Sequence, residues 1–244
     1  MFNSHKIIKM KKYILIITLI SLTFSACFFD HIKGSGNIVS EERVVPVFNE
    51  ISIKGAGTII LTQGDSQSLK IETDDNILPA ITTEVSRDKL IISTQGSILN
   101  FTSLVYEITL PVIYGIEVSG SAKVHGNEKI NAEDIDLKIS GSGEIILLLS
   151  AVEVNTNITG SGKIKLNGAA EEIRIKISGS GDCDAKEFSC EDARVKVTGS
   201  GNCKINATEN LDVSVSGSGD VYYYSNPDIS TSISGSGTVQ KRNL

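Results

Sequence analysis

The sequence feature that constrains this chain most is a Gly-Ser-Gly tripeptide that returns at nearly constant spacing. A related copy, Gly120-Ser121-Ala122, precedes the others and has alanine in place of the second glycine. Successive copies are 18 to 21 residues apart. Self-similarity at this period is typical of repeat architectures, in which each unit packs on its neighbours. The tripeptides occupy residues 141–143, 160–162, 179–181, 199–201, 217–219 and 235–237.

Alignment on the tripeptide places similar residues in columns. The residue directly before it is always Ser or Thr. Upstream of each tripeptide, apolar and charged residues alternate, as in Ile173–Ile177. Alternation with period two, built from β-branched residues, is typical of a strand with one buried face. The column two residues before the tripeptide contains Val118, Ile139, Ile158, Ile177, Val197, Val215 and Ile233.

Two all-β architectures accommodate such units, a parallel solenoid and an antiparallel meander with the tripeptide as a hairpin loop. Only the solenoid stacks each residue on its equivalent, about 4.8 Å away, and so explains the columns. We therefore predict a parallel β-helix (β-solenoid) with one coil per 18–21 residues. Gly179 and Gly181 are expected to point inward at a bend. Length changes fall between Leu166 and Glu171-Glu172, where a loop is expected to protrude from each coil.

The first 26 residues have the composition of an export signal. Four lysines precede an apolar run, Tyr13–Phe24, and Ser25-Ala26 forms a small-residue cleavage site before Cys27. Met10 opens the same signal as well as Met1 does. We predict lipidation at Cys27, because several acyl chains give firm membrane anchoring. Ordinary secretion is the alternative.

After this signal peptide (1–26) we expect a lipidated tether over 27–36 and one solenoid domain over 37–244. Residues 115–240 contain the repeats, whereas 37–114 are rich in strands but less regular, with a short helical turn after Asn76. We interpret 37–114 as the start of the same sheet. Its predicted strands include Ile51–Ile53, Thr58–Leu61, Leu69–Glu72 and Leu90–Ile92.

Charge and histidine content narrow the functional classes. The chain has a formal net charge of −6, and without residues 1–26 it has 19 basic and 29 acidic residues, a net of −10. No basic patch stands out, so nucleic acid is not expected as a partner. Only His125 lies in the predicted domain, beside Gly126, where a solvated turn residue is expected. We predict no catalytic residue, no cofactor and no metal site.

Beyond the repeat, short blocks follow one another in a specific order: Phe48–Gly57, Thr62–Asp65, Ile71–Ile77, Thr109–Pro111, Ile116–Ser121 and Gly217–Tyr223. Their order resembles the head GIN domain of putative auto-transporter adhesins, over roughly residues 45–240. The resemblance implies a right-handed β-helix on an exported bacterial protein that is often lipid-anchored. It brings no catalytic residues with it.

A stripe of hydroxyl groups is the regular surface grid that the repeat predicts. It could bind glycan or another ordered surface, with Tyr222 as a stacking platform, but side-chain ladders that hold the bends are favoured. For Tyr222, capping of the last coil is the favoured alternative. The candidate surface-binding residues are Ser178, Ser180, Thr198, Ser200, Ser216, Ser218 and Tyr222.

Two further columns have alternative interpretations. Asp182, Asn202 and Asp220 could offer oxygen atoms to Ca²⁺, but a solvated ladder is favoured. Cys183 and Cys203 are expected to stack in one buried column, where a disulfide or two free thiols would fit, with free thiols favoured. Cys190 is expected in a protruding loop.

We therefore expect a non-enzymatic, lipid-anchored envelope protein that acts as an adhesin or surface-interaction module, located in the outer membrane. Its partners are the membrane and either a glycan or an envelope protein. The alternatives are a structural scaffold that binds another cell-surface protein and a polysaccharide-active β-helix. For the latter, Asp182 and Asp184 lack a clear basic partner in the sequence.

Overall fold

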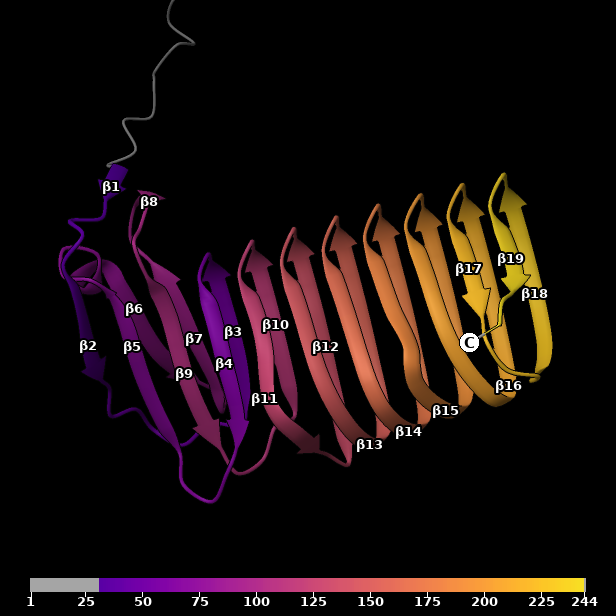
Figure 1. Ribbon diagram of the computed structural model, residues 1–244, viewed down its shortest axis with the longest axis horizontal. Helices are drawn as coiled ribbons and strands as arrows, with labels where there is room; N and C mark the ends of the chain where they lie inside the picture. The colour runs from indigo at the N-terminus through magenta and orange to yellow at the C-terminus, as the bar shows by residue number, and fades with distance from the viewer. Residues whose placement is uncertain (1–30, 244) are drawn as a thin grey trace, which may run out of the picture. The chain divides into compact units, whose positions relative to one another are not determined.

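A computed structural model describes residues 31–243, and from Ile32 onward they form one compact unit (Figure 1). The predicted signal and Cys27 lie outside the described residues. The elements before the repeats are β1 (His31–Lys33), β2 (Ile38–Glu42), β3 (Glu50–Gly55), β4 (Thr58–Gln63), β5 (Ser68–Asp74), the 3₁₀ helix η1 (Leu78–Ala80), β6 (Ile81–Ser86), β7 (Lys89–Thr94), β8 (Ser97–Asn100) and β9 (Leu104–Leu110). The repeats form β10 (Gly115–Gly120), β11 (Lys123–Asn131), β12 (Asp134–Gly141), β13 (Glu144–Gly160), β14 (Lys163–Gly179), β15 (Asp182–Gly199), β16 (Asn202–Gly217), β17 (Asp220–Tyr223), β18 (Asp228–Gly235) and β19 (Thr238–Lys241).

The repeats stack as parallel coils, which confirms the solenoid and excludes the meander. Ile158 pairs with Ile177, and Ile177 pairs with Val197, each one unit further along the chain. Cys183 likewise lies in register with Cys203. The right hand of the coils remains a prediction from the family resemblance.

Each coil has two faces that meet at the tripeptide, along the upper edge of Figure 1. We call the segments that precede the tripeptide face A, for example 172–178, and those that follow it face B, for example 182–190. Apolar side chains of both faces point between them and form a continuous core, which includes Ile164, Ile177 and Val197. Within residues 31–243, no helix is long and apolar enough to cross a bilayer.

The two glycines of the tripeptide lie differently from each other. Gly181 is buried, as predicted, and an added Cβ would lie 2.5 Å from Ile158 Cγ2 and 2.7 Å from the Gly162 carbonyl oxygen. Gly179 is exposed, so the prediction that it points inward is wrong. It has a φ of +117°, and an added Cβ would lie 2.6 Å from the Gly160 carbonyl oxygen of the preceding coil. The left-handed backbone changes the direction in which its side chain would point.

Length differences between coils are absorbed by β-bulges, not by protruding loops. The register of β15 against β16 shifts between Ala185 and Ser189 and again between Cys190 and Asp192. A bulge inserts extra residues while the strand continues. Cys190 is therefore buried inside the coil, with 2% of its surface exposed, and the prediction of a loop thiol is wrong. Cys183, Cys190 and Cys203 are all free.

Apart from β1 and β8, which form a two-stranded sheet of their own, the N-terminal strands belong to the same sheet and close its first end. β7 pairs in parallel with β3, and β9 pairs in parallel with β4, although both come later in the chain. β6, β5 and β2 then add antiparallel strands at this end. The four strands predicted in this region and the helical turn after Asn76 are present, as β3, β4, β5, β7 and η1.

The segment predicted as a tether contacts this first end. Gly36 N–H donates to Asp74 Oδ1 at 2.7 Å, and Ser35 Oγ lies 2.6 Å from Asp75 Oδ1. Thr102 N–H donates to Asp74 Oδ2 at 2.7 Å. Asp74 therefore joins the chain around Gly36, the end of β5 and the segment before β9.

Candidate interaction surface

The predicted hydroxyl residues lie together along the upper edge of Figure 1, where the coils bend at the tripeptide. Ser178 pairs with Thr198, and Thr198 pairs with Ser216, so the row follows the solenoid axis. A second row, one residue beyond each first glycine, follows the same bend. We call the two rows the hydroxyl edge; its central members are Ser178, Ser180, Thr198, Ser200, Ser216 and Ser218.

Five of the six central residues are exposed to solvent, Ser178 is half-buried, and the fold uses none of the six hydroxyls. Ser180, Thr198, Ser200, Ser216 and Ser218 are all exposed. Among the described residues, none of the six central hydroxyls makes a side-chain hydrogen bond, whereas the main chain of the same bend is bonded to the preceding coil. Each hydroxyl can both donate and accept. The edge therefore offers a periodic array of free hydrogen-bonding groups.

Tyr222 does not lie on this edge. It is half-buried on face B, where its hydroxyl is 3.4 Å from Asp220 Oδ2 and the Arg242 guanidinium lies 5.1 Å from its ring centroid. Tyr224 is covered by Lys186, with Nζ at 5.3 Å from the ring centroid. Both rings thus make cation–π contacts within the last coils.

The acidic column of face B forms a hydrogen-bonded ladder. Asn202 Nδ2 donates to Asp182 Oδ1 at 3.1 Å, and Thr238 Oγ1 lies 2.7 Å from Asp220 Oδ1. Asp184, which the sequence left without a clear basic partner, has one on the next coil: Lys204 Nζ lies 2.9 Å from its Oδ2. The hydrogen bond to Asp184 raises the pKa of Lys204. In residues 31–243 no three His, Cys, Asp or Glu side chains are grouped so as to hold a metal ion.

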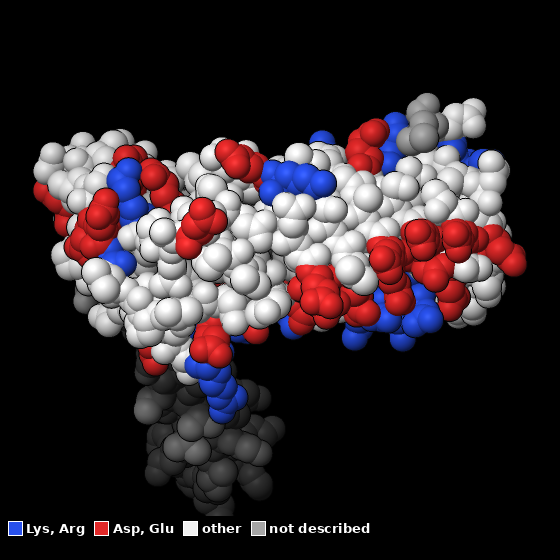
Figure 2. Space-filling model, turned by 90° about the horizontal axis from the view of Figure 1, so that it is seen from below, with Lys and Arg blue, Asp and Glu red and all other residues white. Residues whose placement is uncertain are grey.

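The opposite bend carries a ladder of acidic residues. Figure 2, which views the molecule from below, shows acidic side chains following one another along this edge. Glu153, Glu172 and Asp192 are successive register partners within it. Arg174 reaches into the ladder, where it pairs with Glu153 and with Glu172 at 2.9 Å.

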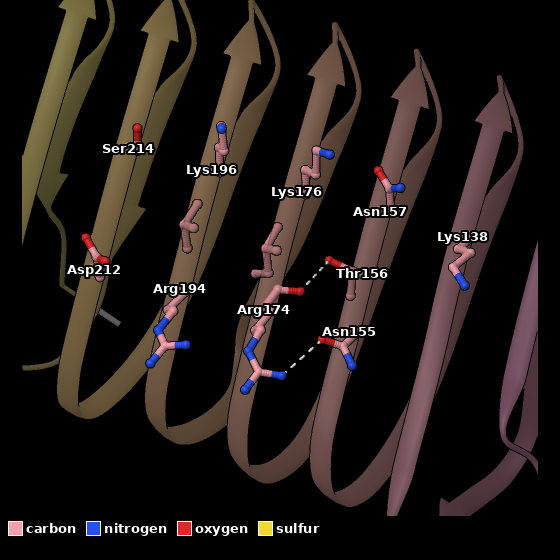
Figure 3. Close-up of a pocket in the computed structure, with 12 residues that line it drawn as sticks. Lys138, Asn155, Thr156, Asn157, Arg174, Lys176, Arg194, Lys196, Asp212 and Ser214 are labelled. Atoms are coloured by element: carbon pink, nitrogen blue, oxygen red, sulfur yellow. Dashed lines mark hydrogen bonds between the residues drawn. The ribbon is translucent and has the colours of Figure 1, made fainter.

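Face A holds a basic cluster, so the prediction that no basic patch stands out is wrong. A shallow trough of about 430 Å³ runs across the coils here (Figure 3). One wall, the arginine row, consists of Asn155, Arg174, Arg194 and Asp212. The other wall, the lysine row, consists of Lys138, Asn157, Lys176, Lys196 and Ser214.

The signal for this cluster was present in the sequence. Ile173-Arg174-Ile175-Lys176-Ile177 and Ala193-Arg194-Val195-Lys196-Val197 repeat one pattern exactly one coil apart, with the charges at the outward positions. Reading the outward columns as well as the inward ones would have brought the four charges together. The net charge gives no indication of these four basic residues, because the chain is acidic as a whole.

Parallel coils with long uninterrupted columns define the class of protein, a β-solenoid of about seven turns. The family model of the putative auto-transporter adhesin, head GIN domain, matches residues 47–227. The chain belongs to this family, which confirms the resemblance found in the sequence.

Solved structures with related folds include three bacterial proteins. A putative adhesin from Bacteroides fragilis is 28% identical, with 86% of this chain and 100% of that chain covered and a TM-score of 0.81. A putative adhesin from Parabacteroides distasonis is also 28% identical, with 87% and 100% covered and a TM-score of 0.72. A putative adhesin from Parabacteroides merdae, at 23% identity with 87% and 99% covered and a TM-score of 0.71, shares the fold. Among curated proteins, none matches the sequence.

Proposed function

We propose that this protein is a non-enzymatic, lipid-anchored component of the bacterial cell envelope that acts in adhesion through the hydroxyl edge. Cys27 is the proposed lipidation site, and the outer membrane is the proposed location. Membership of an adhesin family supports a role at the cell surface or envelope.

The observation that carries the proposal is the row of free hydroxyls. A fold that used these groups to hold its bends would bond them to one another or to the main chain. Instead, the described bends are held by main-chain bonds such as Ser180 N–H to the Gly160 carbonyl oxygen at 2.8 Å. The hydroxyls then remain available for a ligand with many hydrogen-bonding groups, such as a glycan.

The proposal is tested by applying the purified mature protein to glycan and extracellular-matrix arrays. A variant with Ser180→Ala, Ser200→Ala and Ser218→Ala should lose binding while keeping its melting temperature, because the three hydroxyls are exposed and make no side-chain bond within the described chain.

The matched control removes three exposed hydroxyls from the N-terminal region, away from the edge, as Ser40→Ala, Ser66→Ala and Ser86→Ala, and should bind as the wild type does. Absence of binding on every array would contradict the adhesion proposal. Equal loss in both variants would contradict the assignment to the hydroxyl edge.

A second candidate is a scaffold that docks on another envelope protein through the C-terminal coil. All eight residues of β18 are exposed, including Ile229 at 36% and Ile233 at 45%. An exposed strand edge can pair with a strand of another chain. A scaffold role predicts that the protein captures one stoichiometric envelope partner and that the variant Ile229→Lys/Ile233→Lys loses this capture. If the variant captures the partner as the wild type does, the scaffold role is excluded.

A further inference from the structure

The trough on face A places like charges directly on one another. Arg174 is the register partner of Arg194, and Lys176 is the register partner of Lys196. Neighbouring coils are about 4.8 Å apart, and like charges in directly opposed positions destabilise a sheet. The stacking of Lys176 on Lys196 is therefore not explained by stability, in a chain whose net charge is −6.

Part of this positive charge is already balanced by carboxylates. Arg174 pairs with Glu153 and Glu172, and Arg194 Nη1 lies 3.7 Å from Glu172 Oε1. Lys138, at the end of the lysine row, lies 2.7 Å from Asp136 Oδ2. The acidic ladder thus holds the guanidinium groups along one wall of the trough.

The lysine row is different. Within residues 31–243, neither Lys176 nor Lys196 makes an ion pair. Arg194 faces them across the trough with 66% of its side chain exposed. In Figure 3 the two lysines and Arg194 come from adjacent coils and border the same trough. The positive charge that remains available lies at the two lysines and, because its contact with Glu172 is as long as 3.7 Å, in part at Arg194.

The shape of the trough favours a linear ligand. The lysine row follows five successive coils and the arginine row follows four of them, and the floor is formed at Thr156, Ile175 and Val195, between the two walls. Asn155 and Asn157 continue the walls on one side of the cations with amide groups, which bond well to sugar hydroxyls. Asp212 follows Arg194 in its row and places a negative charge at the other end.

We propose that this trough binds a linear anionic polysaccharide built from uronic acid units, with carboxylates at Lys176, Lys196 and Arg194. Lys176 and Lys196 lie on adjacent coils about 4.8 Å apart, so carboxylates of one extended chain can reach both of them. The twelve described residues that line the trough include no aromatic side chain, and single-stranded nucleic acids depend on such side chains for base stacking.

The inference goes beyond the hydroxyl edge, because it concerns another surface and another ligand chemistry. It rests on the proposed function only in treating the protein as a binder of surface polymers. If the trough does not bind the polymer, the proposal for the hydroxyl edge is unaffected, because the two surfaces are tested by different variants.

The test measures binding of the mature protein to polygalacturonate by calorimetry, at low ionic strength and with EDTA present. Dextran serves as the neutral polymer, and polyglutamate and single-stranded DNA serve as other polyanions. The variant Lys176→Gln/Lys196→Gln should bind polygalacturonate about tenfold more weakly, because two exposed charge contacts are lost. Both lysines are exposed and their mutual repulsion is removed, so the melting temperature should stay unchanged or rise slightly.

The matched control is Lys163→Gln/Lys165→Gln, which removes the same charge from two exposed lysines of face B. It should bind as the wild type does, and dextran should not bind. No binding of polygalacturonate, or equal weakening in both variants, would overturn the proposal. Equal affinity for polyglutamate or DNA would also overturn it, since charge alone would then be recognised. Binding to arrays that depends on the hydroxyl edge would survive all of these results.

Discussion

Glycine is needed at two positions of each tripeptide for two different reasons. At Gly179 the backbone is left-handed, with a φ of +117°, and an L side chain would be strained there. At Gly181 the backbone is ordinary, but a Cβ would overlap the core and the main chain of the preceding coil. The second reason depends on packing, so it can be tested by a single methyl group.

Gly181→Ala should lower the free energy of unfolding by about 1–3 kcal/mol, because the added methyl overpacks a bend that has no free space. Chemical denaturation followed by circular dichroism measures this change. Ser180→Ala, one residue earlier and exposed, is the control and should change stability little. Similar stabilities of the two variants would contradict the packing at this bend.

The three buried thiols are the other residue-level feature. Burial, with the charge of Asp192, raises the pKa of Cys190 to about 12. The hydrogen bond with Cys183, together with burial, raises the pKa of Cys203 well above its usual range. Thiolates, not thiols, react with alkylating reagents.

Iodoacetamide at pH 8 should therefore leave Cys183, Cys190 and Cys203 unmodified in the folded protein and modify all three in denaturant. Mass spectrometry of the intact chain and of its peptides gives the result. Rapid labelling of any of the three in the native state would show that its column is open to solvent.

At the scale of elements, the first end of the solenoid depends on one carboxylate. The hydrogen bond from the Thr102 backbone N–H lowers the pKa of Asp74, and that from Gly36 N–H adds to it. A carboxyl whose pKa is lower in the folded than in the unfolded chain stabilises the fold above its unfolded pKa. That contribution is lost as the pH falls through the folded pKa.

Asp74→Asn should therefore lower the melting temperature at pH 7, and the difference from the wild type should shrink as the pH falls below about 4. Thermal unfolding between pH 2.5 and 7 measures it. Asp65→Asn, in an exposed turn of the same region, is the control and should show no such pH dependence. A constant difference across this range would contradict the role of the Asp74 charge.

The strands also differ in how well they could be predicted from the sequence. The inward columns and the strands of 37–114 could be predicted, because apolar and polar residues alternate visibly in a single sequence. The stacking of Cys183 on Cys203 followed from the repeat. The burial of Cys190 could not be predicted, because a bulge and a protruding loop add the same number of residues to a sequence. The pairing of β7 with β3 could not be predicted either, since it depends on contacts between residues that are far apart in the sequence.

For the surface, the sequence located the hydroxyl edge but misplaced its aromatic neighbour. Tyr222 comes four residues after Ser218, and the bend turns it onto face B. The basic cluster was missed because its charges are separated by about 20 residues in the chain. These residues become neighbours only because one coil of the solenoid has about the same length as that separation.

At the scale of the whole molecule, attachment to the membrane determines where the solenoid can act. Cys27→Ser removes the proposed acylation site and should shift the protein from the membrane fraction to the soluble fraction of the envelope, because lipid chains supply the binding energy. Fractionation and immunoblotting measure the distribution, and Ser25→Thr is the control. An unchanged membrane fraction would contradict lipid anchoring at this cysteine.

Every surface described above depends on equivalent residues lying one above another along a single axis. Spin labels at position 119, paired in turn with 198, 216 and 234, test this in a chain with the three buried cysteines replaced by alanine and Cys27 by serine. Because these positions lie four, five and six coils apart, pulsed electron paramagnetic resonance should give backbone separations that rise evenly, at about 19, 24 and 29 Å. Separations that alternate between short and long would mean that neighbouring units run in opposite directions, and would contradict the stacked columns.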